Sequence, residues 1–160
     1  MTTSTVIAAT GARYRFAGWA AIASGVVSIV AFASLFAYLA TQEPVFQATG
    51  VMPLVGSALL ATSDLGSALQ AVLMIPVASA LDALNRHNAP GLSRAAFAVG
   101  VLALLAVAAL RLLTFANPAV PGILFMAPMG FVGLWLIAVN ATARGTLSWG
   151  LRIVGVLAGV

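Results

Sequence analysis

Long uncharged apolar runs separated by short polar stretches dominate the chain after its first 15 residues. A transmembrane helix needs about 20 apolar residues, because each residue rises about 1.5 Å and the hydrocarbon core is about 30 Å thick. Four runs meet this requirement, and they predict spans at about 16–40, 63–84, 93–116 and 122–140. A fifth run, 148–160, would rise only about 18 Å, so we expect a partial, truncated helix there.

The stretch from Ser63 to Ala116 predicts a helical hairpin across the membrane, because two uncharged runs flank the polar loop 85–91. The sequence Thr62-Ser63-Asp64 is typical of a helix start, where such side chains accept hydrogen bonds from free backbone amides. Counted outward from the loop, Asp64 and Arg111 each lie about 27 to 30 Å along their helices. We therefore expect the two charges at similar depth, near the interface opposite the loop.

Two arrangements of Asp64 and Arg111 fit this pattern. In the simpler one, Asp64 caps its helix beside the headgroups and Arg111 extends its long side chain outward to water. In the other, the carboxylate and the guanidinium form a direct intramembrane charge pair that faces the bundle. This candidate pair is the one site that the sequence suggests.

The stretches outside the hairpin indicate where the first helix begins and ends. Residues 1–12 lack periodicity and predict a flexible N-terminal tail, so that 13–160 form a single transmembrane domain. Glu43-Pro44 is expected to end the first helix, since proline removes a backbone donor. The broken apolar stretch 45–60 predicts an outer loop with a short interfacial helix.

The second span raises a problem of length. One helix from Pro53 to Leu84 would be about 48 Å long, well beyond the hydrocarbon core, so we expect it to tilt strongly or to break near Ser63. Pro76 inside this span frees one carbonyl and predicts a kink.

Polar residues near the hairpin loop predict local stabilisation. Asp82 and Arg86 stand four residues apart with the acid first, so they can pair across one helical turn. Ser93 is expected to cap the third span. His87 has no cysteine and no carboxylate cluster beside it, which favours a solvated loop residue over a metal ligand.

The composition identifies an integral membrane protein. Of the 160 residues 62% are hydrophobic and 6% charged, and the mean hydropathy is +1.13, whereas about a quarter of the residues of a soluble domain are charged. Helices satisfy their own backbone hydrogen bonds in lipid, and no segment alternates as barrel strands do. The predicted fold is an all-α, polytopic transmembrane helical bundle with four full spans and the partial fifth helix.

The arginines indicate the orientation. Six of the seven fall on the N-terminal side of the expected membrane: Arg13, Arg15, Arg86, Arg94, Arg144 and Arg152. The other side carries Glu43 and, near its boundary, Arg111. By the positive-inside rule we expect a multi-pass protein of the cell inner (plasma) membrane with a cytoplasmic N-terminus. Because the arginines are spread singly, no nucleic-acid partner is expected.

Small residues recur at every fourth position in the first span, in the rows Ala17, Ala21, Gly25 and Ala20, Ser24, Ser28. Such spacing lets helices approach closely. Two interpretations are open, namely packing within the chain and contact with a second copy or another membrane protein. The lipid bilayer is the partner that the composition itself requires.

No constellation of reactive groups stands out. The three acidic residues lie apart, histidine occurs once and cysteine is absent, so we expect no catalytic, cofactor-binding or metal-binding residues and no enzyme. Transporters usually place ionisable groups near the midplane, and neither Asp64 nor Arg111 is that deep. By elimination the sequence favours a structural or partner-binding helical bundle, with a small transporter or channel-like module working as an oligomer as the alternative.

Three segments carry a resemblance: the hairpin from Asp64 to Leu84, the loop Asn85–Ser93 followed by Arg94, and Gly130-Phe131-Val132-Gly133-Leu134-Trp135 ahead of a glycine-rich final helix. Together they resemble uncharacterised bacterial multi-span membrane proteins of the domain-of-unknown-function class, over roughly the last two thirds of the chain. The resemblance implies a helical fold and a bacterial membrane location, and no activity.

Overall fold

Helices account for 93% of the residues that the computed structural model describes, which are 3–86, 90–117 and 120–142, and no strand occurs among them. In chain order the elements are α1 (Thr3–Thr41), α2 (Glu43–Thr49), α3 (Leu54–Asn85), α4 (Pro90–Ala116), the 3-10 helix η1 (Gly122–Phe125) and α5 (Met126–Thr142). Among these described residues, four segments are long and apolar enough to span a membrane: 14–41 within α1, the whole of α3, the whole of α4, and 123–141. The expected all-α polytopic fold with four full spans is confirmed. His87 and the expected fifth helix at 148–160 lie outside the described residues.

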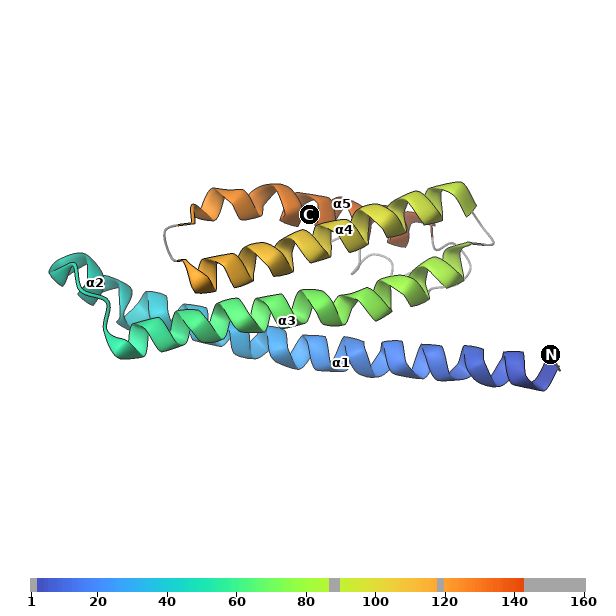
Figure 1. The fold of residues 1–160 in the computed structure, drawn as a ribbon, viewed down its shortest axis with the longest axis horizontal. Coiled ribbons are helices and arrows are strands. Elements are labelled where there is room, and N and C mark those ends of the chain that lie inside the picture. Colours follow the sequence, from blue (N-terminus) through green and yellow to red (C-terminus); the bar gives the residue numbers. More distant parts are fainter. Residues whose placement is uncertain (1–2, 87–89, 118–119, 143–160) are drawn as a thin grey trace.

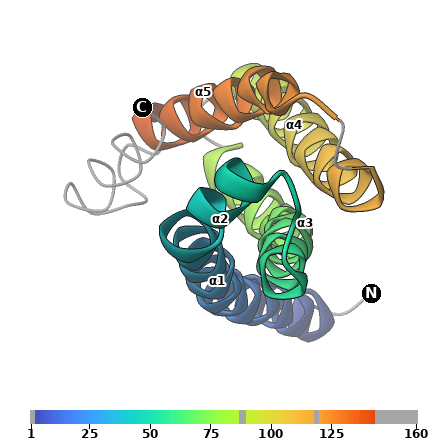
Figure 2. The same cartoon turned by 90° about the vertical axis from the view of Figure 1, so that its left-hand side faces the viewer.

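Helix α3 is the central helix of the bundle. It packs against α1 and against α4, and α4 packs in turn against α5. The long helices lie side by side with alternating direction (Figure 1), and the end-on view separates a pair formed by α1 and α3 from a pair formed by α4 and α5 (Figure 2). We call the end that holds α2 and η1 the α2 end, and the opposite end, where α3 closes at Arg86, the Arg86 end.

Helix α1 begins at Thr3, well before the expected start of the first span near residue 16. Residues 3–12, predicted to form a tail without regular structure, continue the helix instead. They contain no proline, and alanine, which has the highest helix propensity, recurs among them. The span has already nucleated the helix, so its extension through residues 3–12 is favourable even though these residues lack apolar periodicity.

A short helix follows the first span, as expected. Gly50 ends α2 in the left-handed conformation, with φ 69° and its N–H bonded to the carbonyl of Phe46 at 2.7 Å. At the start of α2 the carboxylate of Glu43 accepts hydrogen bonds from Tyr38 and Gln47, and these bonds lower the pKa of Glu43 below its ordinary value. Pro53, in an extended conformation, then directs the chain into α3.

Helix α3 runs unbroken from Leu54 through Ser63, so of the two expected alternatives the break near Ser63 is wrong, and the helix begins nine residues before the start expected at Ser63. The chain changes direction earlier, between α2 and α3, where Gly50 adopts the left-handed conformation and Pro53 is extended. The hydroxyl of Thr62 donates to the carbonyl of Ala58 at 2.8 Å, which accommodates threonine inside a helix instead of at its start. With 32 residues α3 is about 48 Å long, so it has to tilt or extend beyond the hydrocarbon core.

Pro76 lies inside α3 without ending the helix. The axis of α3 turns away from α1 past its middle (Figure 1), which is the change of direction expected where proline removes a backbone donor. The hydroxyl of Ser79 donates to the carbonyl of Pro76 at 2.8 Å. Past Pro76, α3 contacts α5 through Ala78 and Asn85, and α4 through Asp82.

Small side chains build the contact between α1 and α3. Among the residues of α1 whose burial is described, the buried ones are four small residues, Ala17, Ala20, Ser24 and Ala31, and one large residue, Tyr38. At Gly66 of α3 an added methyl carbon would lie 2.9 Å from the Cβ of Ala31, so the two backbones approach closely. Part of the small-residue rows of α1 therefore packs within the chain, whereas Ala21 and Gly25 of the same rows are exposed.

Helices α4 and α5 meet at a large side chain set against a glycine. Trp135 of α5 is 1% exposed, and a methyl carbon added at Gly100 of α4 would lie 2.6 Å from its indole ring. Ala78 of α3 and Val139 of α5 are buried in the same cluster. The ring therefore occupies the space that the missing side chain leaves.

Replacing Gly100 with alanine should destabilise the protein by about 1 to 3 kcal/mol, because the ring of Trp135 has to move from a well-packed position. Thermal unfolding in detergent, followed by circular dichroism, measures the loss. Gly25→Ala is the matched control, since nothing lies near an added methyl at this exposed helical glycine. Equal unfolding temperatures for the two variants would contradict the packing described here.

Candidate ligand cavity and the polar contacts between α3 and α4

Asp64 and Arg111 form a direct ion pair between α3 and α4. Arg111 Nη1 donates to Asp64 Oδ1 at 3.0 Å, and the side chains are 27% and 13% exposed respectively. The simpler expectation, in which Asp64 caps a helix and Arg111 extends outward alone, is wrong because α3 begins ten residues before Asp64. The backbone amides near Asp64 are therefore used inside the helix, and its carboxylate is free to meet the neighbouring helix.

A second polar contact joins the same two helices at the Arg86 end. The hydroxyl of Ser93 donates to Asp82 Oδ1 at 2.7 Å. Asp82 follows Asp64 by 18 residues in α3, and Arg111 follows Ser93 by 18 residues in α4. Eighteen residues make five turns of an α-helix, so the two contacts lie on one face of each helix, about 27 Å apart. Both contacts thus belong to one antiparallel register.

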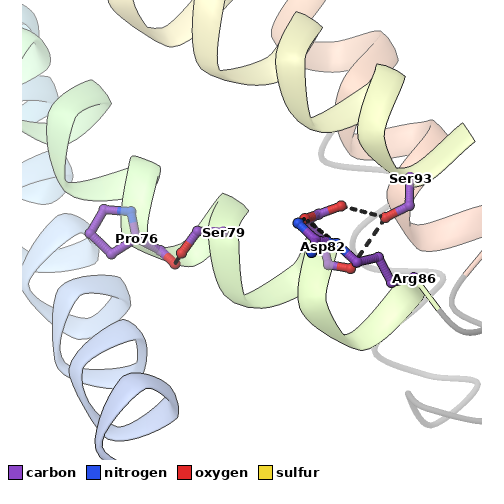
Figure 3. Close-up of polar contacts among 5 residues, drawn as sticks. All are labelled: Pro76, Ser79, Asp82, Arg86 and Ser93. Carbon is purple, nitrogen blue, oxygen red and sulfur yellow. Dashed lines mark hydrogen bonds and ion pairs between the residues drawn. The ribbon is translucent and has the colours of Figure 1, made fainter. Parts of the chain in front are cut away.

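The contact at Asp82 is closed and well satisfied (Figure 3). Arg86 binds Asp82 Oδ2 through Nη2 at 2.6 Å and Nε at 3.0 Å, which confirms the expected pair one turn apart. The Asp82 side chain is only 2% exposed, whereas that of Arg86 is 51% exposed and reaches the surface. Ser93 was expected to cap α4, but α4 begins three residues earlier, at Pro90. Its hydroxyl is therefore available to Asp82.

Asn85 ties the same end of α3 to α5. Its Nδ2 donates to the carbonyl of Val139 at 3.2 Å, and the residue is almost fully buried. Sequence reasoning missed both Asn85 and the contact of Ser93 with Asp82. The signal that could have revealed the second is the equal spacing of 18 residues, whereas a lone asparagine at a helix end carries no such signal.

A half-open cavity of about 740 Å³ lies at the α2 end, beside Asp64 and Arg111. Its walls come from α1, from Met52 and the first turns of α3, from the end of α4, and from Val120 and Phe125 at η1. The polar residues that line it are Ser57, Ser63, Asp64, Arg111 and Thr114, and the other lining residues are apolar. The volume falls within the range of small-molecule sites in proteins.

The register of α3 and α4 explains why the cavity lies there. Because Asp64 lies beside Arg111, the last residue of α4, Ala116, lies level with Leu59 of α3. The first turn of α3 therefore extends past α4 and has no α4 surface to pack against. Phe125 of η1 lies over the guanidinium of Arg111, with 4.3 Å between its ring centroid and the central carbon, and so covers one face of the cation.

The ion pair leaves most of its hydrogen-bonding capacity unused. A guanidinium carries five N–H donors and a carboxylate accepts several hydrogen bonds. Among the described residues, the pair makes the single bond from Nη1 to Oδ1, and Arg111 Nε is buried without an acceptor. The hydroxyls of Ser57 and Thr114 donate to carbonyls of their own helices at 2.8 and 3.0 Å. The cavity wall therefore presents an ion pair that further polar groups can bind.

The comparisons with known proteins add no family. The chain matches no protein-family model, no curated protein and no solved structure. The resemblance to uncharacterised bacterial multi-span proteins thus stays a prediction. Within the described ranges, no group of three or more histidine, cysteine, aspartate or glutamate side chains could hold a metal ion.

Asp64→Asn and Arg111→Leu should each destabilise the protein by about 1 to 3 kcal/mol, less than a fully buried pair, because both side chains remain partly exposed. The double variant should recover much of this loss, since neither charge is then left unpaired. Thermal unfolding in detergent gives the coupling energy. Glu43→Gln combined with Arg111→Leu is the control cycle and should be additive. A coupling below about 0.5 kcal/mol for Asp64 and Arg111 would show that the contact contributes nothing.

Proposed function

We propose that this multi-pass helical membrane protein binds a small molecule in the cavity at the α2 end. One observation carries the proposal, which is the contrast between the two polar contacts of α3 with α4. At Asp82 both carboxylate oxygens are bonded and the side chain is sealed from solvent. At Asp64 the described residues form one hydrogen bond in the ion pair, which stays partly exposed and opens into a cavity of about 740 Å³.

The contrast favours binding over a purely structural role for Asp64 and Arg111. An ion pair that only holds two helices together is best sealed by packing and additional hydrogen bonds, because desolvated charges with unmet capacity are costly. The contact at Asp82 has this form and already holds the register. The proposed role is binding rather than catalysis, since Asp64 and Arg111 supply recognition groups and, among the described residues that line the cavity, no hydroxyl is hydrogen-bonded to Asp64 as a nucleophile is to its base.

The proposal includes an orientation in the plasma membrane. The described arginines other than Arg111 belong to the Arg86 end, which we place in the cytoplasm by the positive-inside rule. The cavity then opens on the non-cytoplasmic side. The large apolar residues exposed on α1, among them Trp19, Ile29 and Phe36, are proposed to contact lipid.

Cysteine labelling tests the orientation, because the natural chain contains no cysteine. We expect a membrane-impermeant maleimide to label Val51→Cys in intact cells, and to label Gly91→Cys only after the membrane is permeabilised. Both positions are exposed and lie at opposite ends of the bundle. Labelling of Gly91→Cys in intact cells would contradict the proposed orientation.

Filling the cavity should weaken the binding of a small molecule. Ala61 lines the cavity, so Ala61→Phe places a ring in it. Three eight-carbon probes, octanoate, octanol and octylammonium, are titrated against the protein in phosphatidylcholine nanodiscs, and bound molecules are counted by native mass spectrometry. We expect at least one probe to bind saturably at one per chain, and Ala61→Phe to weaken that binding by about tenfold or more.

Ala33→Phe is the matched control, since Ala33 is exposed on α1 and does not line the cavity. It should bind the probe as the natural chain does. Absence of saturable binding for all three probes, or equal losses in the two phenylalanine variants, would overturn the proposal.

A further inference from the structure

We infer that the ligand of this cavity is an amphiphile with an anionic headgroup, and that Arg111 binds this headgroup. The inference rests on the proposed function and names its ligand class. The chemistry is shared by two sources, an anionic lipid of the bilayer and a free amphiphilic carboxylate or phosphate.

The charges of the wall favour an anion. Among the described residues that line the cavity, Arg111 is the one cation, and its side chain is about twice as exposed as that of its partner, 27% against 13%. The guanidinium has donors beyond the one that Asp64 uses, and its planar fork matches the geometry of carboxylate and phosphate oxygens. Phe125 covers one face of the guanidinium, so a ligand approaches the N–H groups along their edge.

Other headgroups fit less well. A cationic headgroup would bind the more buried Asp64 and lie beside the charge of Arg111. A neutral hydroxyl headgroup would bind the guanidinium more weakly than an anion, because hydrogen bonds to a charged acceptor are stronger than those to a neutral one. The hydroxyl protons of Ser57 and Thr114 already bind helix carbonyls, and the third hydroxyl of the wall, that of Ser63, is an uncharged donor, so Arg111 is the stronger donor to an anion.

The rest of the wall suits an apolar body. Leu35, Leu60, Phe115 and Val120 line the cavity from α1, α3, α4 and the connection to η1. An apolar chain among these residues is removed from water while the headgroup stays at the ion pair. Asp64 then competes with the headgroup for Arg111, so the natural protein binds the anion more weakly than a chain without this carboxylate.

The experiment compares headgroups on one apolar body, in the same nanodiscs at neutral pH. We expect octanoate to bind the natural chain at least about tenfold more tightly than octanol, with octylammonium the weakest, because a hydrogen bond between charged groups contributes a factor of this size. This ranking needs no variant, so a folding defect cannot obscure it. Equal binding of octanol and octanoate, with Ala61→Phe still weakening both, would overturn the anionic headgroup and leave the proposed function standing.

Variants then assign the headgroup to Arg111. Arg111→Gln should remove the preference for octanoate, Arg111→Lys should retain part of it, and Asp64→Asn should tighten octanoate binding by several-fold, because the competing carboxylate is gone. Arg94→Gln removes an exposed cation at the Arg86 end and is the control for overall charge. An equal loss of preference in Arg94→Gln, or no loss in Arg111→Gln, would overturn the inference.

A last arm distinguishes the two sources. Phosphatidylglycerol replaces part of the phosphatidylcholine in the nanodiscs. If a bilayer lipid supplies the headgroup, phosphatidylglycerol competes with octanoate in the natural chain and not in Arg111→Gln. If the source is a free amphiphile, octanoate binding is the same in both lipids.

Discussion

The antiparallel register of α3 and α4 is the constraint on which the rest of the bundle depends. Two polar contacts, five helical turns apart, hold it at both ends, with Asp64 on Arg111 and Asp82 on Ser93. Between them lie small and aliphatic side chains such as Ala68, Ala71 and Leu104. A slip of one residue would rotate each polar group about 100° away from its partner, into an apolar environment where its exposure is costly.

Close backbone contacts attach the outer helices to this central pair. Gly66 lets α1 approach α3, and Gly100 receives the indole of Trp135 from α5. In lipid the hydrophobic effect does not favour contact between helices over contact with lipid tails. Close packing at such complementary surfaces therefore supplies much of the free energy of helix association. The cavity at the α2 end follows from the same geometry, because α4 ends while α3 continues for another turn.

Particular residues show where prediction from the sequence succeeded and where it failed. The four spans follow from apolar runs alone, and the pair of Asp82 with Arg86 follows from a spacing of four on one helix. The start of α3 was misplaced by nine residues. Thr62-Ser63-Asp64 has the composition of a helix cap, but these residues lie inside the helix. The side chains of serine, threonine and aspartate also form hydrogen bonds within a helix or to a neighbouring helix, and composition does not distinguish these roles from capping.

The sequence by itself determined the class of the protein, the number of full spans and the similar depth of Asp64 and Arg111, since these depend on apolar length and on the rise per residue. Only the tertiary structure decided that the two charges face each other, that Ser93 binds Asp82, and that a cavity opens beside one contact and not the other. Those features depend on the rotation of each helix about its axis and on where its neighbour ends. In these helices apolar and small residues cover most of the surface, so the sequence alone indicates neither which face packs inward nor where a neighbouring helix ends.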